Sequence, residues 1–300
     1  MTLRLPTDGG VAQGHPERSR GVTLVDLHLH TTASDGRATP AELVARAAAA
    51  GVTVIAATDH DTTAGVAEVR AHAERRGMLA IPGIEITAIE NGRDLHMLGY
   101  FFDPANPALN EFLAAQRATR VARIAAIAGR LASLGMPIDV EPILADAARH
   151  TAQSIGRPKV ARAMIEAGYV ADTRQAFEMW LARGCPAFVE RAGAVPEDVI
   201  AIVHSAGGLA SLAHPVRSDI DSRIAKLRDA GLDAIEVYHP DHDAIAVARY
   251  ERVARDLGML VSGGSDFHGD PAHGMEPGGS TLPAREWERL YAERHRYAAG

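Results

Sequence analysis

Residues 22–36 read Val-Thr-Leu-Val-Asp-Leu-His-Leu-His-Thr-Thr-Ala-Ser-Asp-Gly, an apolar run that passes into a polar loop. The β-branched and leucine side chains of residues 22–27 predict a buried strand. Thr39-Pro40 then places an N-cap and a first-turn proline ahead of an alanine-rich helix at about 40–50. A buried strand followed directly by a helix predicts the first half of a βαβ unit.

The same alternation of strand and helix continues along the chain. We expect a helix at about 63–76 and further strands at 52–57, 78–87, 94–102, 208–213, 234–238 and 259–263. Strands that alternate with helices predict parallel pairing within a sheet. About seven such strands approach the (β/α)8 pattern, so the predicted fold class is α/β.

Residues 103–200 follow a different pattern, which is mostly helical and includes a long amphipathic helix at 110–134. We therefore expect a helical insert at 103–200 that contributes to the substrate site. The insert would interrupt a barrel domain formed by residues 22–102 and 201–300. Residues 1–21 are polar and rich in Gly and Pro, without an apolar signal segment, and are predicted to form a disordered extension.

Composition limits the class of protein. The formal charge is −7 and aromatic residues make up 5% of the chain, which argues against binding to long nucleic acid. A small phosphorylated substrate remains compatible, because bound divalent ions would reverse the charge locally. No apolar run reaches the length of a membrane span, and the single cysteine, Cys185, suits a reducing compartment. We therefore expect a cytoplasmic protein with no membrane partner.

Histidine and acidic residues gather at the predicted strand ends. His28 and His30 form a His-x-His pair at the end of the first strand, and residues i and i+2 of a strand face the same side. Asp35 lies in the loop just after them. The other candidates lie on later strands or at their carboxyl ends: Asp59, His60, Glu85, His96, His214, His239, Asp266 and His268.

In a barrel of parallel strands these ends converge on one face, which would bring the candidates into one cleft. Imidazole and carboxylate ligands together suit zinc, manganese and iron. The candidates outnumber the ligands of a single ion, so a cluster of two or three divalent ions is predicted. The histidines of the tail and of the predicted helices are excluded: His15, His72, His150, His204 and His295. His242 and His273 stay undecided.

Several segments resemble the polymerase and histidinol phosphatase (PHP) family, in the family's order. They are Asp26-Leu27-His28-Leu29-His30-Thr31 with Ser34-Asp35-Gly36, Thr58-Asp59-His60-Asp61, Gly83-Ile84-Glu85, His96-Met97-Leu98-Gly99-Tyr100, Ala213-His214-Pro215 and Gly264-Ser265-Asp266-Phe267-His268. The similarity covers roughly residues 23–102 and 205–270. The insert and Gly156-Arg157-Pro158 resemble the branch that removes phosphate from nucleoside 3′,5′-bisphosphates and trims short RNA from the 5′ end.

The resemblance implies a distorted (β/α)7 barrel with a helical insert domain and a trinuclear metal site. By motif, the first ion would be held by His28, His30, Glu85 and Asp266. Glu85 would bridge to a second ion, held also by His96 and His214. The third ion would be held by Asp35, His60 and His268. Some branches have histidine at position 35, and an aspartate there favours Mn²⁺ or Mg²⁺ over Zn²⁺. Mn²⁺ is the expected ion, with Zn²⁺, Fe²⁺ and Mg²⁺ as alternatives.

The implied reaction is hydrolysis of a phosphate ester by in-line attack of a metal-bound hydroxide. His239 would position the phosphate or donate a proton to the leaving oxygen, and Asp59 would orient a ligand histidine. We expect Arg157 and Lys159 to hold a second phosphate, although the bisphosphatase-like branch is expected to have histidine at position 159.

Three arginines recur at helical spacing in the long helix of the insert: Arg117, Arg120 and Arg123. Such a stripe is typical of a solvated face, although Arg120 could point into the cleft.

The expected substrate is the 3′-phosphate of a nucleoside 3′,5′-bisphosphate, with 5′–3′ trimming of short RNA as a further activity. Histidinol phosphate phosphatase is an alternative within the family, and the helical insert counts against it. An exonuclease acting on longer strands is a further alternative. The negative net charge and the low aromatic content count against it, because such an enzyme needs a basic surface with aromatic side chains. A metal-binding protein without turnover and an amidohydrolase acting on C–N bonds are alternatives from other classes. The sequence makes no prediction of oligomeric state.

Overall fold

Strand β1 (Val25–Leu29) extends through His28, two residues beyond the predicted strand, and all of its side chains are buried. The computed structural model describes residues 23–270 and 275–298. The extension predicted at 1–21 and the undecided His273 lie outside the described residues. Strands β2 (Val54–Ala57) and β3 (Leu79–Ala80) pair in parallel with β1, in the order β1-β2-β3.

Helices α1 (Pro40–Ala49) and α2 (Val66–Glu74) connect these strands, as expected of βαβ units. Helix α1 begins at a capping box, in which the Thr39 side chain accepts from the Glu42 N–H and the Glu42 carboxylate accepts from the Thr39 N–H. Its apolar face packs Leu43 and Val44 into a hydrophobic cluster with the sheet residue Ile55. This cluster holds β1 and β2 in place, so their carboxyl ends have defined positions.

A second sheet contains β4 (Gly83–Glu90), β5 (Arg93–Tyr100), β6 (Leu209–Leu212), β7 (Ala234–Tyr238) and β8 (Leu260–Gly263), in that order. Strands β6, β7 and β8 are parallel, as predicted, but β4–β5 and β5–β6 are antiparallel. The prediction of parallel pairing is wrong there because Asn91 and Gly92, both with positive φ, form a two-residue hairpin turn.

The strand predicted at 78–87 is two strands. Pro82 lies between β3 and β4 and has no N–H to donate to a sheet. Glu85 was expected to end a strand, but it is the third residue of β4, which continues to Glu90. An isolated parallel bridge joins His60 to Glu85, so the carboxyl end of β2 still meets Glu85.

The expected (β/α)7 barrel is not confirmed, because the described strands form two sheets and no closed barrel. In the part of the chain that the structure describes, the backbone pairing between the two sheets is limited to isolated bridges, while one hydrophobic cluster contains side chains of both. One is the His60–Glu85 bridge, and another pairs Leu29 at the end of β1 with Phe267. The bridges nevertheless bring the carboxyl end of β1 next to the segment after β8, and the carboxyl end of β2 next to β4.

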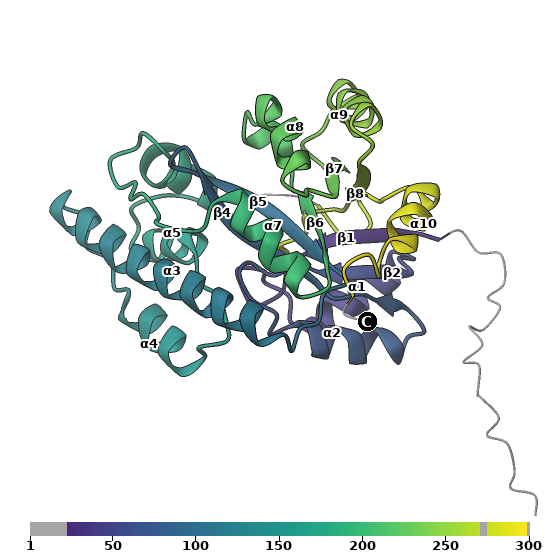
Figure 1. Cartoon of the computed structure of the whole chain (residues 1–300). Helices are drawn as coiled ribbons and strands as arrows, with labels where there is room; N and C mark the ends of the chain where they lie inside the picture. The colour runs from purple at the N-terminus through teal and green to yellow at the C-terminus, as the bar shows by residue number, and fades with distance from the viewer. Residues whose placement is uncertain (1–22, 271–274, 299–300) are drawn as a thin grey trace, which may run out of the picture.

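Residues 103–205 are helical: α3 (Pro107–Ser133), α4 (Glu141–Arg149), α5 (Arg157–Glu166), α6 (Thr173–Ala176), a π-helix at Phe177–Leu181, and α7 (Pro196–Ser205). Helices α3, α4 and α5 gather on one side of the β4–β5 hairpin (Figure 1). Residues of α3, α5 and the π-helix share a hydrophobic cluster that includes Ile127, Met164 and Leu181. Helix α7 packs instead against β4 to β6.

Helices α8 (Asp221–Asp229), α9 (Ala244–Asp256) and α10 (Ala284–Ala292) surround the parallel strands β6 to β8, and Leu227, Tyr250 and Leu290 join the main hydrophobic cluster. None of the helices in the described ranges combines the length and the apolar character needed to cross a membrane.

Candidate metal centre

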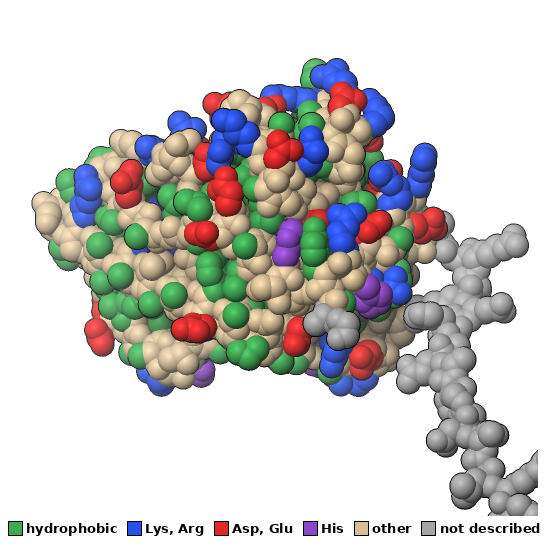
Figure 2. Space-filling view, in the orientation of Figure 1, with side chains coloured by type: hydrophobic (Ala, Val, Ile, Leu, Met, Phe, Trp, Pro, Cys, Tyr) green, Lys and Arg blue, Asp and Glu red, His purple; other side chains and the backbone are tan. Residues whose placement is uncertain are grey.

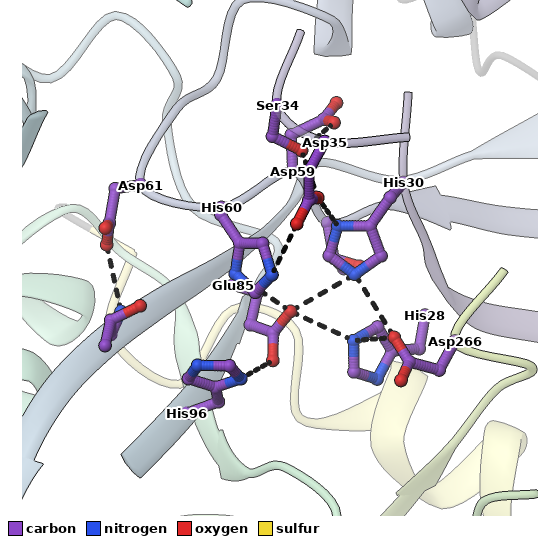
Figure 3. A network of polar contacts seen from close by, with 12 residues as sticks. His28, His30, Ser34, Asp35, Asp59, His60, Asp61, Glu85, His96 and Asp266 are labelled. Carbon is purple, nitrogen blue, oxygen red and sulfur yellow. Dashed lines mark hydrogen bonds and ion pairs between the residues drawn. The ribbon is translucent and has the colours of Figure 1, made fainter. Parts of the chain in front are cut away.

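His28 lies in β1, His30 follows directly after its last residue, and both side chains are fully buried. Their Nε2 atoms lie 3.2 and 3.1 Å from Glu85 Oε2, and both lie 3.3 Å from Asp266 Oδ1. Figure 3 shows the two rings, Glu85 and Asp266 meeting at one point. The structure therefore brings together the four residues expected to hold a first ion, with ligand atoms within 4.8 Å of one another.

A second group forms around Asp35 in the loop after β1. Asp35 Oδ2 lies 3.7 Å from His60 Nε2, and Asp35 Oδ1 lies 3.4 Å from His268 Nε2. These three residues were expected to hold a third ion. His30 joins them, because its Nδ1 lies 3.8 Å from Asp35 Oδ1.

Glu85 connects the groups. Its Oε1 lies 2.7 Å from His96 Nδ1 and 3.1 Å from His214 Nε2, and its Oε2 lies 3.2 Å from His60 Nδ1. In Figure 3 its carboxylate lies in the middle of the network, with histidines on several sides. The structure thus brings the three expected ligands of the second ion together, and Glu85 occupies the bridging place expected for it.

Two of the candidate ligands lie at residues with unusual backbone dihedral angles. His214 (φ 26°) and Asp266 (φ 50°) both have positive φ, which costs energy for residues other than glycine. A Cβ on Gly264 would lie 2.3 Å from the His28 backbone N, so only glycine lets the end of β8 approach β1 this closely. The ligand-bearing segments are therefore held in place by contacts between distant parts of the chain.

The carboxylates of the centre are charged. Burial opposes ionisation, but His60 and His96 hold the pKa of Glu85 well below its ordinary value. In the same way, His60 and His268 lower the pKa of Asp35. Burial opposes the charged form of His60 and lowers its pKa, while Glu85 and Asp35 act in the opposite direction. Neutral imidazole and ionised carboxylate are the forms that bind metal ions.

Other histidines compensate the negative charge. Burial disfavours the charged ring of His30, but the nearby carboxylates of Asp266 and Glu85 raise its pKa to about 10. The buried carboxylates thus require positive charge, which either protons or divalent ions can supply.

The donor set fits divalent metal ions. Buried ring nitrogens of His30, His60 and His214 make no hydrogen bond of good geometry, although carboxylate oxygens lie close to those of His30 and His60. Buried polar atoms normally have a hydrogen-bond partner, so atoms of this kind need another explanation. Coordination of Mn²⁺, Zn²⁺ or Fe²⁺ by these imidazole nitrogens, together with the carboxylates, would explain them.

Asp59 does not contact a ligand histidine in the way that was expected. Its carboxylate accepts from the Thr31 N–H (2.8 Å), the Thr31 hydroxyl (2.7 Å) and the Ser34 hydroxyl (2.7 Å). Asp59 therefore holds the loop between His30 and Asp35, and it positions ligands through the backbone.

His239 lies behind Asp266 and is buried. Its Nε2 is 3.3 Å from Asp266 Oδ2, and its Nδ1 accepts from the Asp241 N–H at 3.1 Å. His239 does not line the cavity described next. The expectation that it contacts the phosphate or the leaving oxygen does not agree with this position, because the ring supports Asp266 instead.

A cavity of about 500 Å³ opens beside the metal-ligand candidates and is bounded on its far side by α3, α5 and the π-helix. Arg157 lines it and donates to Asp94 Oδ2 at 2.9 Å. Lys159 does not line it and pairs with Asp146 at 3.6 Å, because two residues on a helix rotate the side chain by about 200°. The expectation that Lys159 holds a phosphate is therefore not supported.

Arg157 lies in a cavity wall with three further arginines: Arg120, for which a position in the cleft was an open alternative, Arg123, which was expected on a solvated face, and Arg191, which the sequence prediction missed. Arg120 and Arg191 pair with the buried Asp61, while Arg123 and Arg157 pair with Asp94. We call these four arginines the arginine cluster. The helical stripe of arginines is thus not a solvated face, since the side chains of Arg120 and Arg123 are only 12% and 7% exposed.

Glu236 is a further residue that the sequence prediction missed. It lies in β7, is fully buried and accepts from His28 Nδ1 at 2.8 Å. The available signal was a single carboxylate inside the apolar run Ala-Ile-Glu-Val, since a buried carboxylate needs a partner.

Comparison with known proteins identifies relatives that match most of the chain. The sequence profile of the PHP domain matches residues 26–157. A 5′-3′ exoribonuclease of Haemophilus influenzae is 36% identical over 250 residues, which cover 81% of this chain and 89% of the relative. A 3′,5′-nucleoside bisphosphate phosphatase of Chromobacterium violaceum is 34% identical over 261 residues, covering 85% and 90%.

A solved structure from Bifidobacterium adolescentis, provisionally assigned as a metal-dependent phosphoesterase, is 32% identical with a TM-score of 0.81. The alignment covers 89% of this chain and 95% of that one. The motifs, the clustered histidines and carboxylates, and these relatives lead to one conclusion. The chain belongs to the PHP domain family of metal-dependent phosphoesterases, as its sequence predicted.

Proposed function

We propose that this phosphoesterase removes the 3′-phosphate from nucleoside 3′,5′-bisphosphates. The observation that carries the proposal is the arrangement of one cavity. The candidate ligands Asp35, His60, Glu85, His96, His214, Asp266 and His268 line one side, and the arginine cluster lines the other. A substrate with two phosphate groups would place one at each side.

The charges of the arginine cluster support an anionic ligand. Four arginines face two aspartates, Asp61 and Asp94, which leaves an excess of two positive charges. Arg123 Nη2 is buried and has no hydrogen-bond partner. Burial and the neighbouring Arg123 lower the pKa of Arg157 to about 10, which reflects the crowding of positive charge. A phosphate dianion would neutralise the excess and supply acceptors.

The reaction would use water as the nucleophile. Among the described residues, neither serine nor cysteine lines the cavity. Divalent ions bound by the candidate ligands would lower the pKa of water and neutralise charge on the reacting phosphate. Arg157 and Arg123 would hold the phosphate that is retained. Arg217 lines the same cavity and donates to Asp266 Oδ2 at 2.9 Å, so it would lie beside the reacting phosphate.

We further propose three bound ions, with Mn²⁺ preferred because Asp35 supplies an anionic oxygen ligand. The relative named 5′-3′ exoribonuclease supports a second activity, the trimming of short RNA from its 5′ end. On the face shown in Figure 2, acidic and basic side chains are interspersed, which does not favour a path for a long strand on that face.

The test is phosphate release by Mn²⁺-loaded protein from adenosine 3′,5′-bisphosphate, AMP, histidinol phosphate and a 5′-phosphorylated short RNA, with an EDTA-treated control. We expect fast, chelator-sensitive release from the bisphosphate, with AMP as the remaining product. Preference for histidinol phosphate would retain the metal centre and overturn the proposed substrate. Absence of release from every substrate, together with hydrolysis of an amide panel, would favour the amidohydrolase alternative.

A further inference from the structure

Glu236 is a buried carboxylate at the metal centre that the proposed reaction does not use. It is fully buried in β7, and each carboxylate oxygen accepts one hydrogen bond from a ligand-bearing segment. Oε1 lies 2.8 Å from His28 Nδ1, and Oε2 accepts from the His214 backbone N–H at 2.8 Å. The Glu236 side chain thus connects β1 with His214, which follows β6.

The contact with His28 determines which ring nitrogen can bind an ion. A proton on Nδ1, donated to Glu236, leaves the lone pair of a neutral ring on Nε2. Nε2 is the atom that faces Glu85 Oε2 at 3.2 Å and Asp266 Oδ1 at 3.3 Å. A carboxylate that orients a metal-binding histidine in this way also increases the basicity of the ring.

The contact with His214 stabilises an unfavourable backbone. His214 has a φ of 26°, a value that residues other than glycine rarely adopt. The hydrogen bond from its N–H to Glu236 holds this conformation, in which Nε2 of the ring lies 3.1 Å from Glu85 Oε1. Without that hydrogen bond, the His214 backbone would return to a more favourable φ, and the ring would move away from Glu85.

We propose that Glu236 is a positioning residue that sets the metal affinity of the centre, because it fixes the tautomer of His28 and the backbone of His214 together. The inference rests on the proposed ligand set and is independent of the proposed substrate.

The chain offers a matched control in Asp233, which directly precedes the same strand. Asp233 is also buried, accepts from a histidine ring (His204 Nε2, 2.8 Å) and accepts from a backbone N–H (Ala210, 2.9 Å). Its other oxygen binds Arg296 and Tyr297 near the carboxyl end of the described chain. Asp233 therefore makes the same two kinds of contact as Glu236, through one of its oxygens, without touching a candidate ligand.

The experiment compares the wild type, Glu236→Gln and Asp233→Asn after removal of metal with EDTA. Mn²⁺ affinity is measured by calorimetric titration, thermal unfolding is recorded for the metal-free proteins, and the His28 tautomer is read from ¹⁵N NMR of histidine-labelled protein. A glutamine has one acceptor oxygen, so it can satisfy only one of the two contacts.

We expect Glu236→Gln to weaken Mn²⁺ binding by about 10- to 100-fold and to alter the Nδ1–H signal of His28. Asp233→Asn should lower the unfolding temperature but keep the Mn²⁺ affinity within about twofold of wild type. Wild-type affinity in Glu236→Gln, or an equal loss in Asp233→Asn, would overturn the role of Glu236. If the wild type itself bound no Mn²⁺, the ligand set would fail and the inference with it.

Discussion

At the scale of single residues, the arginine cluster depends on Asp61. Its side chain is fully buried and accepts from Arg120 Nε and from Arg191 Nη2 at 3.0 Å. Burial opposes its ionisation, yet Arg120 and Arg191 lower its pKa to about 2. Asp61 therefore compensates two guanidinium groups that are almost excluded from water.

Asp61→Asn should destabilise the protein by about 3–5 kcal/mol, because it leaves buried arginines without a counter-charge. Asparagine tolerates the positive φ at this position, so the backbone should not contribute to the loss. The measurement is the free energy of unfolding in urea. Glu74→Gln, which breaks the exposed Arg70–Glu74 pair, is the control and should change that energy by no more than about 0.5 kcal/mol. Equal effects of the two substitutions would contradict the role given to Asp61.

Two neighbours on α5 test where the retained phosphate binds. Arg157→Gln should raise KM for adenosine 3′,5′-bisphosphate by about 10- to 100-fold, since hydrogen bonds to charged groups contribute about 1.5–3 kcal/mol. Lys159→Gln should leave KM within about twofold, because Lys159 makes only a partly exposed ion pair with Asp146. Steady-state kinetics of the Mn²⁺-loaded variants decide the question. A larger effect of Lys159→Gln would restore the expectation drawn from the sequence.

At the scale of secondary-structure elements, the β4–β5 hairpin determines how Glu85 and His96 meet. Thr87 pairs with His96 across the hairpin, and Glu85 pairs with Leu98. Glu85 and His96 are therefore diagonal neighbours on one face, which allows Glu85 Oε1 to lie 2.7 Å from His96 Nδ1. The register of the hairpin follows from its two-residue turn at Asn91 and Gly92.

Gly92→Ala should therefore cost about 1–2 kcal/mol, because an L-residue is disfavoured at its φ of 70°. Gly129→Ala in the exposed interior of α3 is the matched control. Apart from the adjoining backbone of α3, no atom lies within 4 Å of the added methyl group there, and the substitution should stabilise the helix by about 0.5–1 kcal/mol. Both changes are read from denaturant unfolding, and the opposite signs distinguish the turn requirement from a general effect of adding a methyl group. Stabilisation by Gly92→Ala would show that the turn does not need glycine.

At the scale of the whole molecule, the metal centre lies where two sheets meet, which among the described residues also share a hydrophobic cluster and isolated backbone bridges. Its candidate ligands come from β1, the end of β2, β4, β5 and the segments after β6 and β8. Bound ions would therefore connect the sheets and neutralise the negative charge of the buried carboxylates.

Mn²⁺ at 100 times its dissociation constant for one site should stabilise the EDTA-treated protein by about 2.7 kcal/mol, which corresponds to a rise in Tm of roughly 4 °C. Differential scanning calorimetry measures the shift. Asp266→Asn should lose most of the response, whereas His72→Ala, on the exposed part of α2, should keep it. A wild-type Tm that is insensitive to Mn²⁺ would argue against the centre.

The sequence by itself determined what depends on local chemistry. The apolar run before His28 predicted β1, Thr39-Pro40 predicted the start of α1, and the ordered motifs predicted the PHP family and phosphate-ester hydrolysis. These signals are readable because strand alternation, capping and motif spacing involve residues close together in the chain. The assignment of individual metal ligands remains a proposal, although the structure brings the candidate residues together.

Only the tertiary structure decided which buried charges meet. Arg120 and Arg123 have the spacing of a solvated stripe, but Asp61 and Asp94 from other elements draw them into the cavity wall. Glu236 reaches His28 across 208 positions of sequence. The pairing of buried charges depends on packing between distant elements, because a charge is tolerated in the interior only where the fold supplies its partner.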